Sequence, residues 1–207
     1  AELLELQVRT NPEIKKSVDA IIAQIDRVSK LIRSLLNLAR GDQLKSAERV
    51  DAKSVANEVL DLMGHELRKH DIQLRNQMPD GVLLSVNAEA GPLHQVLLNL
   101  LVNAVHAIDV AVKGGRVQDH AITLSAQDSG SSWILSVSDT GCGISEADMK
   151  NLFKPFFTTK DIGVGTGLGL VTSYRIMESW GGSIEVKSVP GQGSEFRLFL
   201  PKAPERD

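Results

Sequence analysis

The stretch that decides the fold of this 207-residue sequence begins with Asp139-Thr-Gly-Cys-Gly-Ile144 and ends with Gly163-Val-Gly-Thr-Gly-Leu-Gly-Leu170. Glycine lets backbone N–H groups approach a ligand closely and accepts positive φ angles. Free amides ahead of a helix that is predicted to begin near Gly167 form a seat for a polyphosphate. Asp139 follows an apolar strand predicted at 133–137, so its carboxylate can accept a hydrogen bond from an exocyclic amine. Each glycine loop alone also fits an ordinary turn, but the two loops together with a polar helix stripe favour a nucleotide site.

That stripe lies on a helix predicted over residues 91–108, which is otherwise aliphatic. Four polar residues recur at spacings of four, four and three, which places them on one face. They are Gln95, Asn99, Asn103 and His106. A buried asparagine without a partner is costly, whereas its amide oxygen is a suitable ligand for Mg²⁺. A solvated face is the alternative, but the leucines around Asn99 and Asn103 leave little exposed surface and favour a functional role.

Composition narrows the class of protein. The hydrophobic fraction of 42% can supply a core, and the formal net charge of −3 gives no sign of nucleic-acid binding. No apolar run reaches the length that spans a bilayer. No signal peptide is visible, and because the first residue is Ala1 the sequence is expected to be a fragment. The single cysteine, Cys142, excludes an internal disulfide and fits a reducing compartment. Its place in the glycine turn favours a small space-filling residue over a reactive thiol.

The amino-terminal part predicts a long helix at about 12–40. Its apolar residues alternate spacings of four and three, as in a coiled-coil seam. They are Ile14, Val18, Ile21, Ile25, Val28, Ile32 and Leu35. One helix of this length cannot bury such a seam alone, so a hairpin partner and a second subunit are expected. A two-helix cap packed on its own domain is the alternative.

The rest of the sequence follows a polar linker at 41–50 and predicts a two-layer α/β sandwich of the α+β class over 51–202. Three main helices are expected at 52–69, with Leu62 on the buried face, at 91–108, and at 167–180, with Tyr174 facing inward. Strands are expected at 72–76, 82–86, 121–125, 133–137, 183–187 and 196–200. Ser145-Glu-Ala-Asp148 predicts a capped short helix.

Four motifs in this order resemble the catalytic ATP-binding domain of bacterial sensor histidine kinases of two-component systems. His94-Gln-Val-Leu-Leu-Asn-Leu-Leu-Val-Asn-Ala104 is similar to their asparagine box, and Asp139-Thr-Gly-Cys-Gly143 to their first glycine box. Phe153-Lys-Pro-Phe156 is similar to their phenylalanine box, and Gly165-Thr-Gly-Leu-Gly-Leu170 to their second glycine box. Gly191-Gln-Gly-Ser194 fits as well, and Phe156-Phe-Thr-Thr-Lys160 most resembles the nitrogen-regulatory branch.

The resemblance implies the Bergerat fold of the GHKL superfamily, a mixed sheet with three main helices, as a catalytic ATP-binding domain at 51–202. It implies that residues 1–45 are part of the dimerisation and phosphoacceptor hairpin, with its second helix at about 12–40. The expected function is transfer of the ATP γ-phosphoryl group to a histidine and onward to an aspartate of a response regulator. The expected partners are a second copy, through the N-terminal helix, and a receiver domain. The expected location is cytoplasmic, with membrane attachment only through segments outside this sequence.

The resemblance also assigns roles to residues, with ATP and Mg²⁺ as the expected cofactors. Asp139 would bind the adenine amine, and Asn103 would be the direct Mg²⁺ ligand. Asn99 and Lys160 are the expected catalytic residues, with Lys160 reaching the γ-phosphate. His106 stands where many relatives have a lysine near the phosphates. The expected ATP contacts are Asn99, Asn103, His106, Asp139, Gly141, Gly143, Lys160, Gly163, Gly165, Thr166, Gly167, Leu168, Gly169 and Ser194.

The sequence departs from the family at the acceptor histidine, which is expected in a His-Glu-x-x-Asn/Thr-Pro context. His65-Glu66-Leu67-Arg68 matches the start of that context, but no proline follows and the segment comes after the long helix. No phosphoacceptor is therefore expected in this chain. Two alternatives stay open. One is a GHKL-type ATP hydrolase, as in gyrase, mismatch-repair and Hsp90-type proteins. Those proteins have a water-activating glutamate at the position where this sequence has Asn99, and an amide cannot act as that base. The other is a nucleotide-sensing pseudokinase dimer module.

Overall fold

The computed structural model describes residues 13–22, 25, 48–117, 119–160 and 165–204. The chain separates into two compact units, residues 1–41 and 42–207. In the first unit, residues 13–22 are helical, and Ile14, Ile21 and Ile25 are exposed. The part of the predicted helix and seam that follows Ile25 lies outside the described residues.

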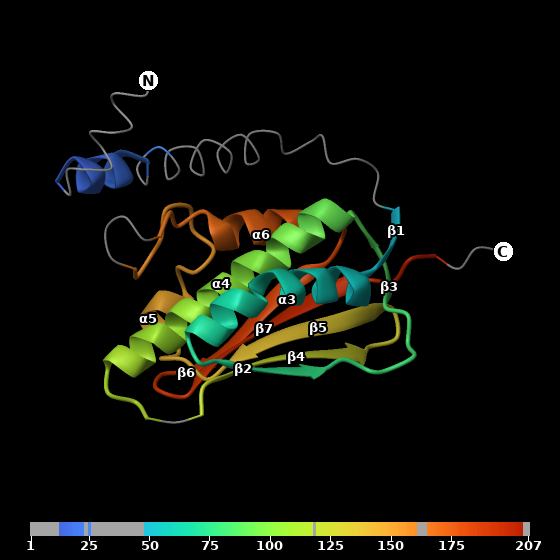
Figure 1. Ribbon diagram of the computed structural model, residues 1–207. Coiled ribbons are helices and arrows are strands. Elements are labelled where there is room, and N and C mark those ends of the chain that lie inside the picture. Colours follow the sequence, from blue (N-terminus) through green and yellow to red (C-terminus); the bar gives the residue numbers. More distant parts are fainter. Residues whose placement is uncertain (1–12, 23–24, 26–47, 118, 161–164, 205–207) are drawn as a thin grey trace, which may run out of the picture. The chain divides into compact units, whose positions relative to one another are not determined.

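A five-stranded sheet and three main helices form the two layers of the second unit (Figure 1). In spatial order the strands are β2 (Gln73–Gln77), β4 (Ala121–Asp128), β5 (Ser132–Asp139), β7 (Gly193–Pro201) and β6 (Ser183–Val189). β2 runs parallel to β4, and the other neighbouring pairs are antiparallel. One face of the sheet is covered by α3 (Ala52–Lys69), α4 (Ala90–Lys113) and α6 (Gly169–Ser179), and α4 packs between the other two helices. This mixed sheet under three helices confirms the predicted α+β sandwich.

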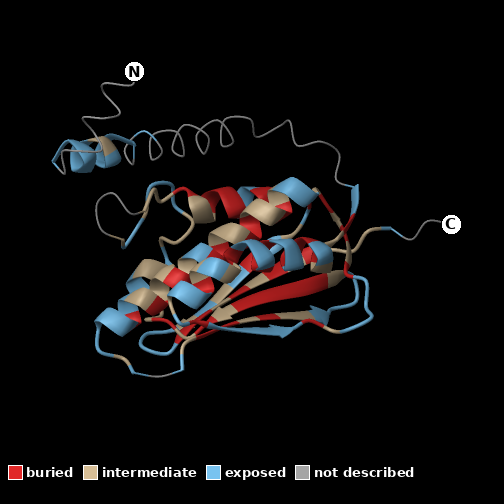
Figure 2. Ribbon diagram, in the orientation of Figure 1, coloured by how far each residue is buried: buried red, intermediate tan, exposed pale blue. Residues whose placement is uncertain are grey.

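The core of the second unit lies between α4 and the sheet. β5, in the middle of the sheet, is buried along most of its length (Figure 2). Leu93, Leu97 and Ile108 of α4 are 0% exposed, and truncating such a side chain to alanine costs about 2–5 kcal/mol. Among the described residues, α4 is also the one helix long and apolar enough to cross a membrane by length and composition, a test that the central helix of a globular core passes as well.

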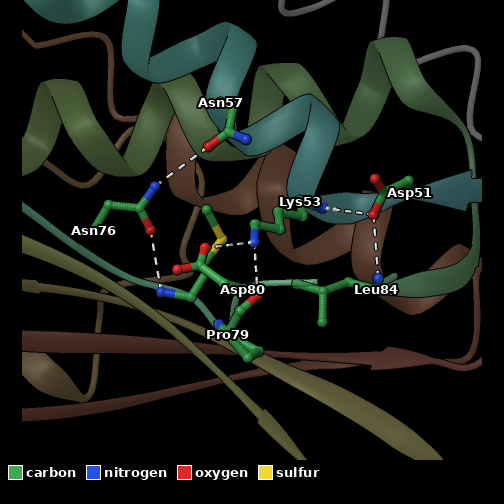
Figure 3. Close-up of polar contacts among 8 residues, drawn as sticks. Asp51, Lys53, Asn57, Asn76, Pro79, Asp80 and Leu84 are labelled. Carbon is green, nitrogen blue, oxygen red and sulfur yellow. Dashed lines mark hydrogen bonds and ion pairs between the residues drawn. The ribbon is translucent and has the colours of Figure 1, made fainter. Parts of the chain in front are cut away.

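Asp51 caps α3 and ties it to the loop that follows β2 (Figure 3). Its Oδ1 accepts the N–H of Lys53 at 3.1 Å and that of Leu84 at 3.2 Å. The Lys53 ammonium reaches across the same loop and donates to the Pro79 carbonyl at 2.6 Å. A cap of this kind stabilises a helix by about 1 kcal/mol. The predicted bounds of α3 are confirmed, with its start fixed by this carboxylate.

Other predicted elements differ at their ends. β3 (Ser85–Ala88) lies later than the strand predicted at 82–86. β1 (Glu48–Asp51) falls inside the predicted linker and pairs with β3 in a small antiparallel sheet. A short polar strand such as β1 is specified by its partner and not by a pattern of its own. α4 continues to Lys113, beyond the predicted end at residue 108, because the chain reverses only at the following glycines.

Two apolar side chains do not face the core as predicted. Leu62 on α3 is 60% exposed, because other residues of α3 form the buried face of that helix. Tyr174 on α6 is 38% exposed and packs its ring against Phe153, with 5.2 Å between centroids. The short helix α5 (Glu146–Met149) is capped as predicted, since the Ser145 Oγ accepts the N–H of Asp148 at 3.1 Å.

Candidate nucleotide site

Asp139 ends β5 with a buried carboxylate, 9% exposed. Its Oδ1 accepts the N–H of Gly141 at 2.8 Å, and Ser194 lies directly across from it on β7. Burial raises the pKa of Asp139 to about 6, while the N–H groups of Gly141 and Ser194 and the charge of Arg116 act in the opposite direction. A buried carboxylate with a raised pKa is a candidate functional group, because perturbed pKa values cluster at functional sites.

The turn after Asp139 requires glycine at two positions. A Cβ on Gly141 would lie 2.6 Å from the Cβ of Ala107 on α4. Gly143 has a φ of 70°, and a Cβ there would collide with the Val189 carbonyl. The turn is also bonded to α4 through the N–H of Cys142, which donates to the Ala107 carbonyl at 3.0 Å. The turn is therefore packed closely between α4 and the connection from β6 to β7.

Cys142 behaves as the small residue that the sequence predicts. Its side chain is half-buried, and its Sγ lies 3.5 Å from the Gly143 carbonyl. Burial, and next the charge of Asp139, raise the pKa of the Cys142 thiol. A thiol with a raised pKa is a poor nucleophile near neutral pH, so nothing in this geometry activates it.

Asn99 lies on α4 where α6 begins. Its Nδ2 donates to the Gly169 carbonyl and to the Ser173 Oγ, both at 3.3 Å. Ser173 is 0% exposed, and its hydroxyl donates in turn to the Gly169 carbonyl at 3.0 Å. A Cβ on Gly169 would lie 3.6 Å from the Asn99 Cγ. Sequence reasoning missed Ser173, because a lone serine on a helix carries no signal of such a contact.

Asn103 lies one helical turn further along α4 and faces Lys160. The Lys160 Nζ donates to the Asn103 Oδ1 at 2.9 Å, and burial lowers the pKa of Lys160. The Asn103 amide oxygen already accepts a hydrogen bond from a cationic group, and an amide oxygen is a ligand type that Mg²⁺ accepts. The residues present therefore fit a metal ion bound together with a polyphosphate. His106, on the same stripe of α4, is half-buried.

The second glycine segment leads into α6. The Gly167 carbonyl accepts the N–H of Phe156 at 3.0 Å, and Gly167 has a φ of 65°. This conformation explains why α6 begins at Gly169 and not at Gly167 as predicted. Leu168 is fully buried, and its N–H donates to the Thr166 Oγ1 at 3.3 Å. Gly165 of the same segment is described, whereas the predicted contact Gly163 lies outside the described residues.

α4 joins two groups of predicted site residues. Ala107 touches the glycine turn that carries Asp139, and Asn103 meets Lys160 one turn earlier on the same helix. A carboxylate at one end and amides, an ammonium and glycine backbone at the other suit a ligand with an amine and a polyphosphate. A separate surface hollow of about 440 Å³ contains none of these residues and is lined by Arg68, Asp71, Ile72, Gln73, Asp119 and His120.

Arg116 is a second residue that sequence reasoning missed. Its Nη1 donates to the Gly141 carbonyl at 2.8 Å, and its charge acts on Asp139. The available signal was a basic residue directly after Gly114 and Gly115, which end α4. That signal does not predict which residue Arg116 contacts, because the contact depends on how the loop folds back toward β5.

Comparison with known proteins agrees with this chemistry. Residues 88–204, more than half of the chain, match the family described as histidine kinase-, DNA gyrase B- and HSP90-like ATPase. Sensor histidine kinase ZraS of Escherichia coli O157:H7 is 35% identical over 189 residues, which is 91% of this chain and 39% of ZraS. The chain thus spans about two fifths of the length of that relative.

Solved structures of histidine kinases share the fold. A nucleotide-free catalytic domain of the histidine kinase ThkA is 30% identical with a TM-score of 0.65, covering 76% of this chain and 97% of that domain. ThkA in complex with the response regulator protein TrrA is 25% identical with a TM-score of 0.74, covering 98% of this chain and 56% of that one. The chain therefore belongs to the family of histidine kinase-, DNA gyrase B- and HSP90-like ATPases, and its second unit contains the ATP-binding catalytic domain of a sensor histidine kinase.

Proposed function

We propose that this chain transfers the γ-phosphoryl group of ATP to a histidine supplied from outside it, and that the phosphoryl group then passes to an aspartate of a response regulator. The observation that carries the proposal is the role of Asn99, whose amide donates to the Gly169 carbonyl and the Ser173 hydroxyl. An ATP hydrolase of the same superfold needs a base at this point to activate water, and an amide cannot serve as one. Phosphoryl transfer to a protein acceptor needs alignment and charge neutralisation instead.

The adenine end of the proposed site is the turn after β5. Asp139 would accept a hydrogen bond from the adenine amino group, since its carboxylate is buried and already oriented by the Gly141 N–H. Gly141 and Gly143 would shape the adenine pocket, since a side chain at either position would collide with Ala107 or with the Val189 carbonyl and displace the turn. Ser194 would lie at the edge of the same pocket, across from Asp139.

The phosphate end is the part of α4 that faces Lys160 and the start of α6. Asn103 would hold Mg²⁺ through Oδ1, and Asn99 would line the metal and phosphate site. Bound Mg²⁺ would neutralise phosphate charge as the γ-phosphoryl group leaves. Lys160 would contact the γ-phosphate, and His106 would lie near the phosphates on the same helix face. The remaining contacts would come from Gly163, Gly165, Thr166, Gly167, Leu168 and Gly169.

The acceptor histidine is proposed to lie outside this chain. His65, which begins the partial match to the acceptor motif, is exposed on α3 inside the catalytic unit. The exposed isoleucines of the helix at 13–22 support a homodimer formed through the N-terminal helix. A receiver domain is proposed as a partner because ThkA, of similar fold, was solved with TrrA. A cytoplasmic location is proposed because ATP is the substrate and the one cysteine is free.

The test separates the kinase from its two alternatives. ATP affinity is measured by calorimetry with and without Mg²⁺, and the chain is then incubated with γ-labelled ATP and a separately supplied helical hairpin that carries the acceptor histidine. We expect labelled phosphohistidine on the hairpin and none on a hairpin with glutamine in that position. Free phosphate released without the hairpin would instead identify a hydrolase. Tight ATP binding without either product would identify a nucleotide-sensing module.

A further inference from the structure

Arg116 is held beside the first glycine turn by the way α4 ends. The chain reverses at Gly114 and Gly115, and Gly115 has a φ of 85°. The Gly115 N–H donates to the Val112 carbonyl at 2.9 Å. The Arg116 N–H donates to the Ala111 carbonyl at 3.1 Å. These paired bonds are those of a Schellman motif, so the backbone of Arg116 is fixed against the end of α4.

The side chain of Arg116 acts on the residue that orients Asp139. Its Nη1 donates to the Gly141 carbonyl at 2.8 Å. The N–H of the same glycine donates to the Asp139 Oδ1 at 2.8 Å. Gly141 is also packed so closely on Ala107 that an added Cβ would lie 2.6 Å from it. One glycine is thus held on three sides, by the guanidinium, by the carboxylate and by α4.

Arg116 also supplies positive charge to Asp139. Burial raises the pKa of Asp139 to about 6, and the Gly141 N–H, the Ser194 N–H and the Arg116 charge oppose that rise. Among the described residues, the Cys142 thiol also interacts with Asp139, and burial raises the pKa of this thiol above its ordinary value of 9.0. The thiol is therefore neutral near pH 7, and Arg116 is the group whose charge favours the ionised carboxylate.

We propose that Arg116 is a positioning residue for adenine recognition, which orients the Asp139 carboxylate by binding the carbonyl of Gly141, whose N–H donates to that carboxylate. The inference rests on the proposed function, because Asp139 must be the acceptor for the adenine amino group. An ionised carboxylate only accepts hydrogen bonds, whereas a protonated one carries a donor on one oxygen and loses part of that match. Arg116 therefore acts through Gly141 and Asp139 and needs no contact with the nucleotide.

The test compares two substitutions at Arg116 with a control. Arg116→Met removes the donor and the charge at similar length, and Arg116→Lys keeps the charge and one donor group. Arg75→Met is the control, because Arg75 is exposed on β2 and its side chain binds Gln73 of the same strand. ATP and GTP affinities are measured by calorimetry from pH 5 to pH 8, and thermal unfolding verifies that each variant is folded.

We expect Arg116→Met to weaken ATP binding at pH 7, because the turn that carries Gly141 and Asp139 loses the guanidinium that holds it, with little change for GTP. The pH below which ATP binding is lost should move upward, because Asp139 protonates more easily without the guanidinium. Arg116→Lys should restore the pH profile of the wild type. An Arg116→Met variant that matches Arg75→Met in affinity and in pH profile would overturn the role of Arg116. A wild-type chain that binds no ATP would overturn the nucleotide assignment along with it.

A second measurement needs no nucleotide. The titration of the Asp139 carboxylate is followed by carbon NMR in the nucleotide-free wild type and in Arg116→Lys and Arg116→Met. The midpoint should rise in Arg116→Met and stay close to that of the wild type in Arg116→Lys. If Arg116→Met does not fold, the lysine variant carries the test through its weaker ATP binding, since a lysine does not reproduce the fixed geometry of a guanidinium. Equal midpoints and equal affinities in all folded variants contradict the proposal.

Discussion

The Lys160 ammonium and the Asn103 amide oxygen are joined by a hydrogen bond of 2.9 Å, although 57 residues separate them in the sequence. Lys160 belongs to the segment between the phenylalanine motif and the second glycine motif, whereas Asn103 lies on the central helix. The bond brings the proposed γ-phosphate contact and the proposed metal ligand together in the nucleotide-free chain. It also places a positive charge where a polyphosphate would need one.

Replacing Lys160 by methionine should lower phosphoryl transfer much more than ATP binding. Loss of one charge-stabilising group at a reacting centre typically costs about 10²-fold or more in rate. Transfer to a supplied acceptor hairpin and ATP affinity are measured on the same preparation. Lys154→Met is the matched control, because Lys154 is an exposed lysine in the phenylalanine motif that precedes this segment. Equal transfer rates in the two variants would remove Lys160 from the catalytic group.

Asn103→Ala should weaken Mg²⁺-ATP binding and leave metal-free ATP binding largely unchanged. The substitution removes the amide oxygen that lies opposite Lys160, which is the proposed metal ligand. Calorimetry with and without Mg²⁺ gives the ratio of the two affinities. Asn57→Ala serves as control, since Asn57 is exposed on α3 and its amide oxygen accepts a hydrogen bond from Asn76 (Figure 3). An unchanged metal dependence would contradict the ligand assignment.

Asp139 should make the nucleotide-free chain less stable as pH rises. Burial raises its pKa from 3.8 to about 6, so the folded chain binds this proton more tightly than the unfolded chain. The free energy of unfolding therefore falls between those two pH values, by up to about 3 kcal/mol, and the contribution is constant above them. Asp139→Asn removes the effect, and urea unfolding at several pH values measures it.

The same variant should lose its preference for ATP over GTP, because an amide presents a donor where the carboxylate only accepts. Asp61→Asn is the control, since Asp61 is exposed on α3. A gain in stability with a loss of adenine selectivity would show that the buried carboxylate is kept for binding at the expense of stability. Identical pH slopes in wild type and Asp139→Asn would contradict the first expectation, and unchanged selectivity the second.

Gly141→Ala should reduce both stability and ATP affinity. The new methyl group would lie 2.6 Å from the Ala107 Cβ, so either the turn or α4 must shift. Overpacking of this kind costs about 1–3 kcal/mol, measurable by thermal unfolding. Gly91→Ala is the control, because a Cβ on Gly91 meets nothing within 4 Å. Wild-type affinity in a folded Gly141→Ala variant would mean that the turn can shift without affecting the base pocket.

Ser173→Ala should destabilise the contact between α4 and α6. The Ser173 hydroxyl is 0% exposed, accepts from Asn99 at 3.3 Å and donates to the Gly169 carbonyl at 3.0 Å. Leaving buried polar groups without this partner costs about 1–3 kcal/mol. Ser179→Ala on the same helix is the control, since Ser179 is exposed. Thermal unfolding midpoints that are equal in the two variants would contradict the expectation.

Local patterns predicted the elements that carry their own signals. α3, the β4–β5 hairpin and the cap of α5 follow from apolar spacing, turn residues and a capping box. β1 could not be predicted, because its polar residues form a strand only through pairing with β3. Leu62 and Tyr174 were placed on the wrong side of their helices, since a helical wheel does not show where the neighbouring elements end.

The candidate site divides in the same way. Asp139, Asn99 and Asn103 were predicted from residue type and spacing, because carboxylates and amides on otherwise apolar elements are unusual. Arg116 and Ser173 were not found, because each acts through a contact with a residue far away in the sequence. Such contacts are set by the packing of whole helices and strands. A basic residue after two glycines, or a single serine on a helix, does not by itself predict which residue it will contact.

The central helix sets the distance between the two ends of the proposed nucleotide site. Asn103 and Ala107, which belong to opposite ends of the site, are separated by four residues and therefore by about 6 Å of helical rise. Inserting one residue between them would rotate one end of the proposed site away from the other by about 100°, so we expect such an insertion to abolish nucleotide binding. In the proposed site, the distance from base to phosphates is therefore set by a helix in the core of the domain. Changes in the surrounding loops can alter affinity without altering that distance.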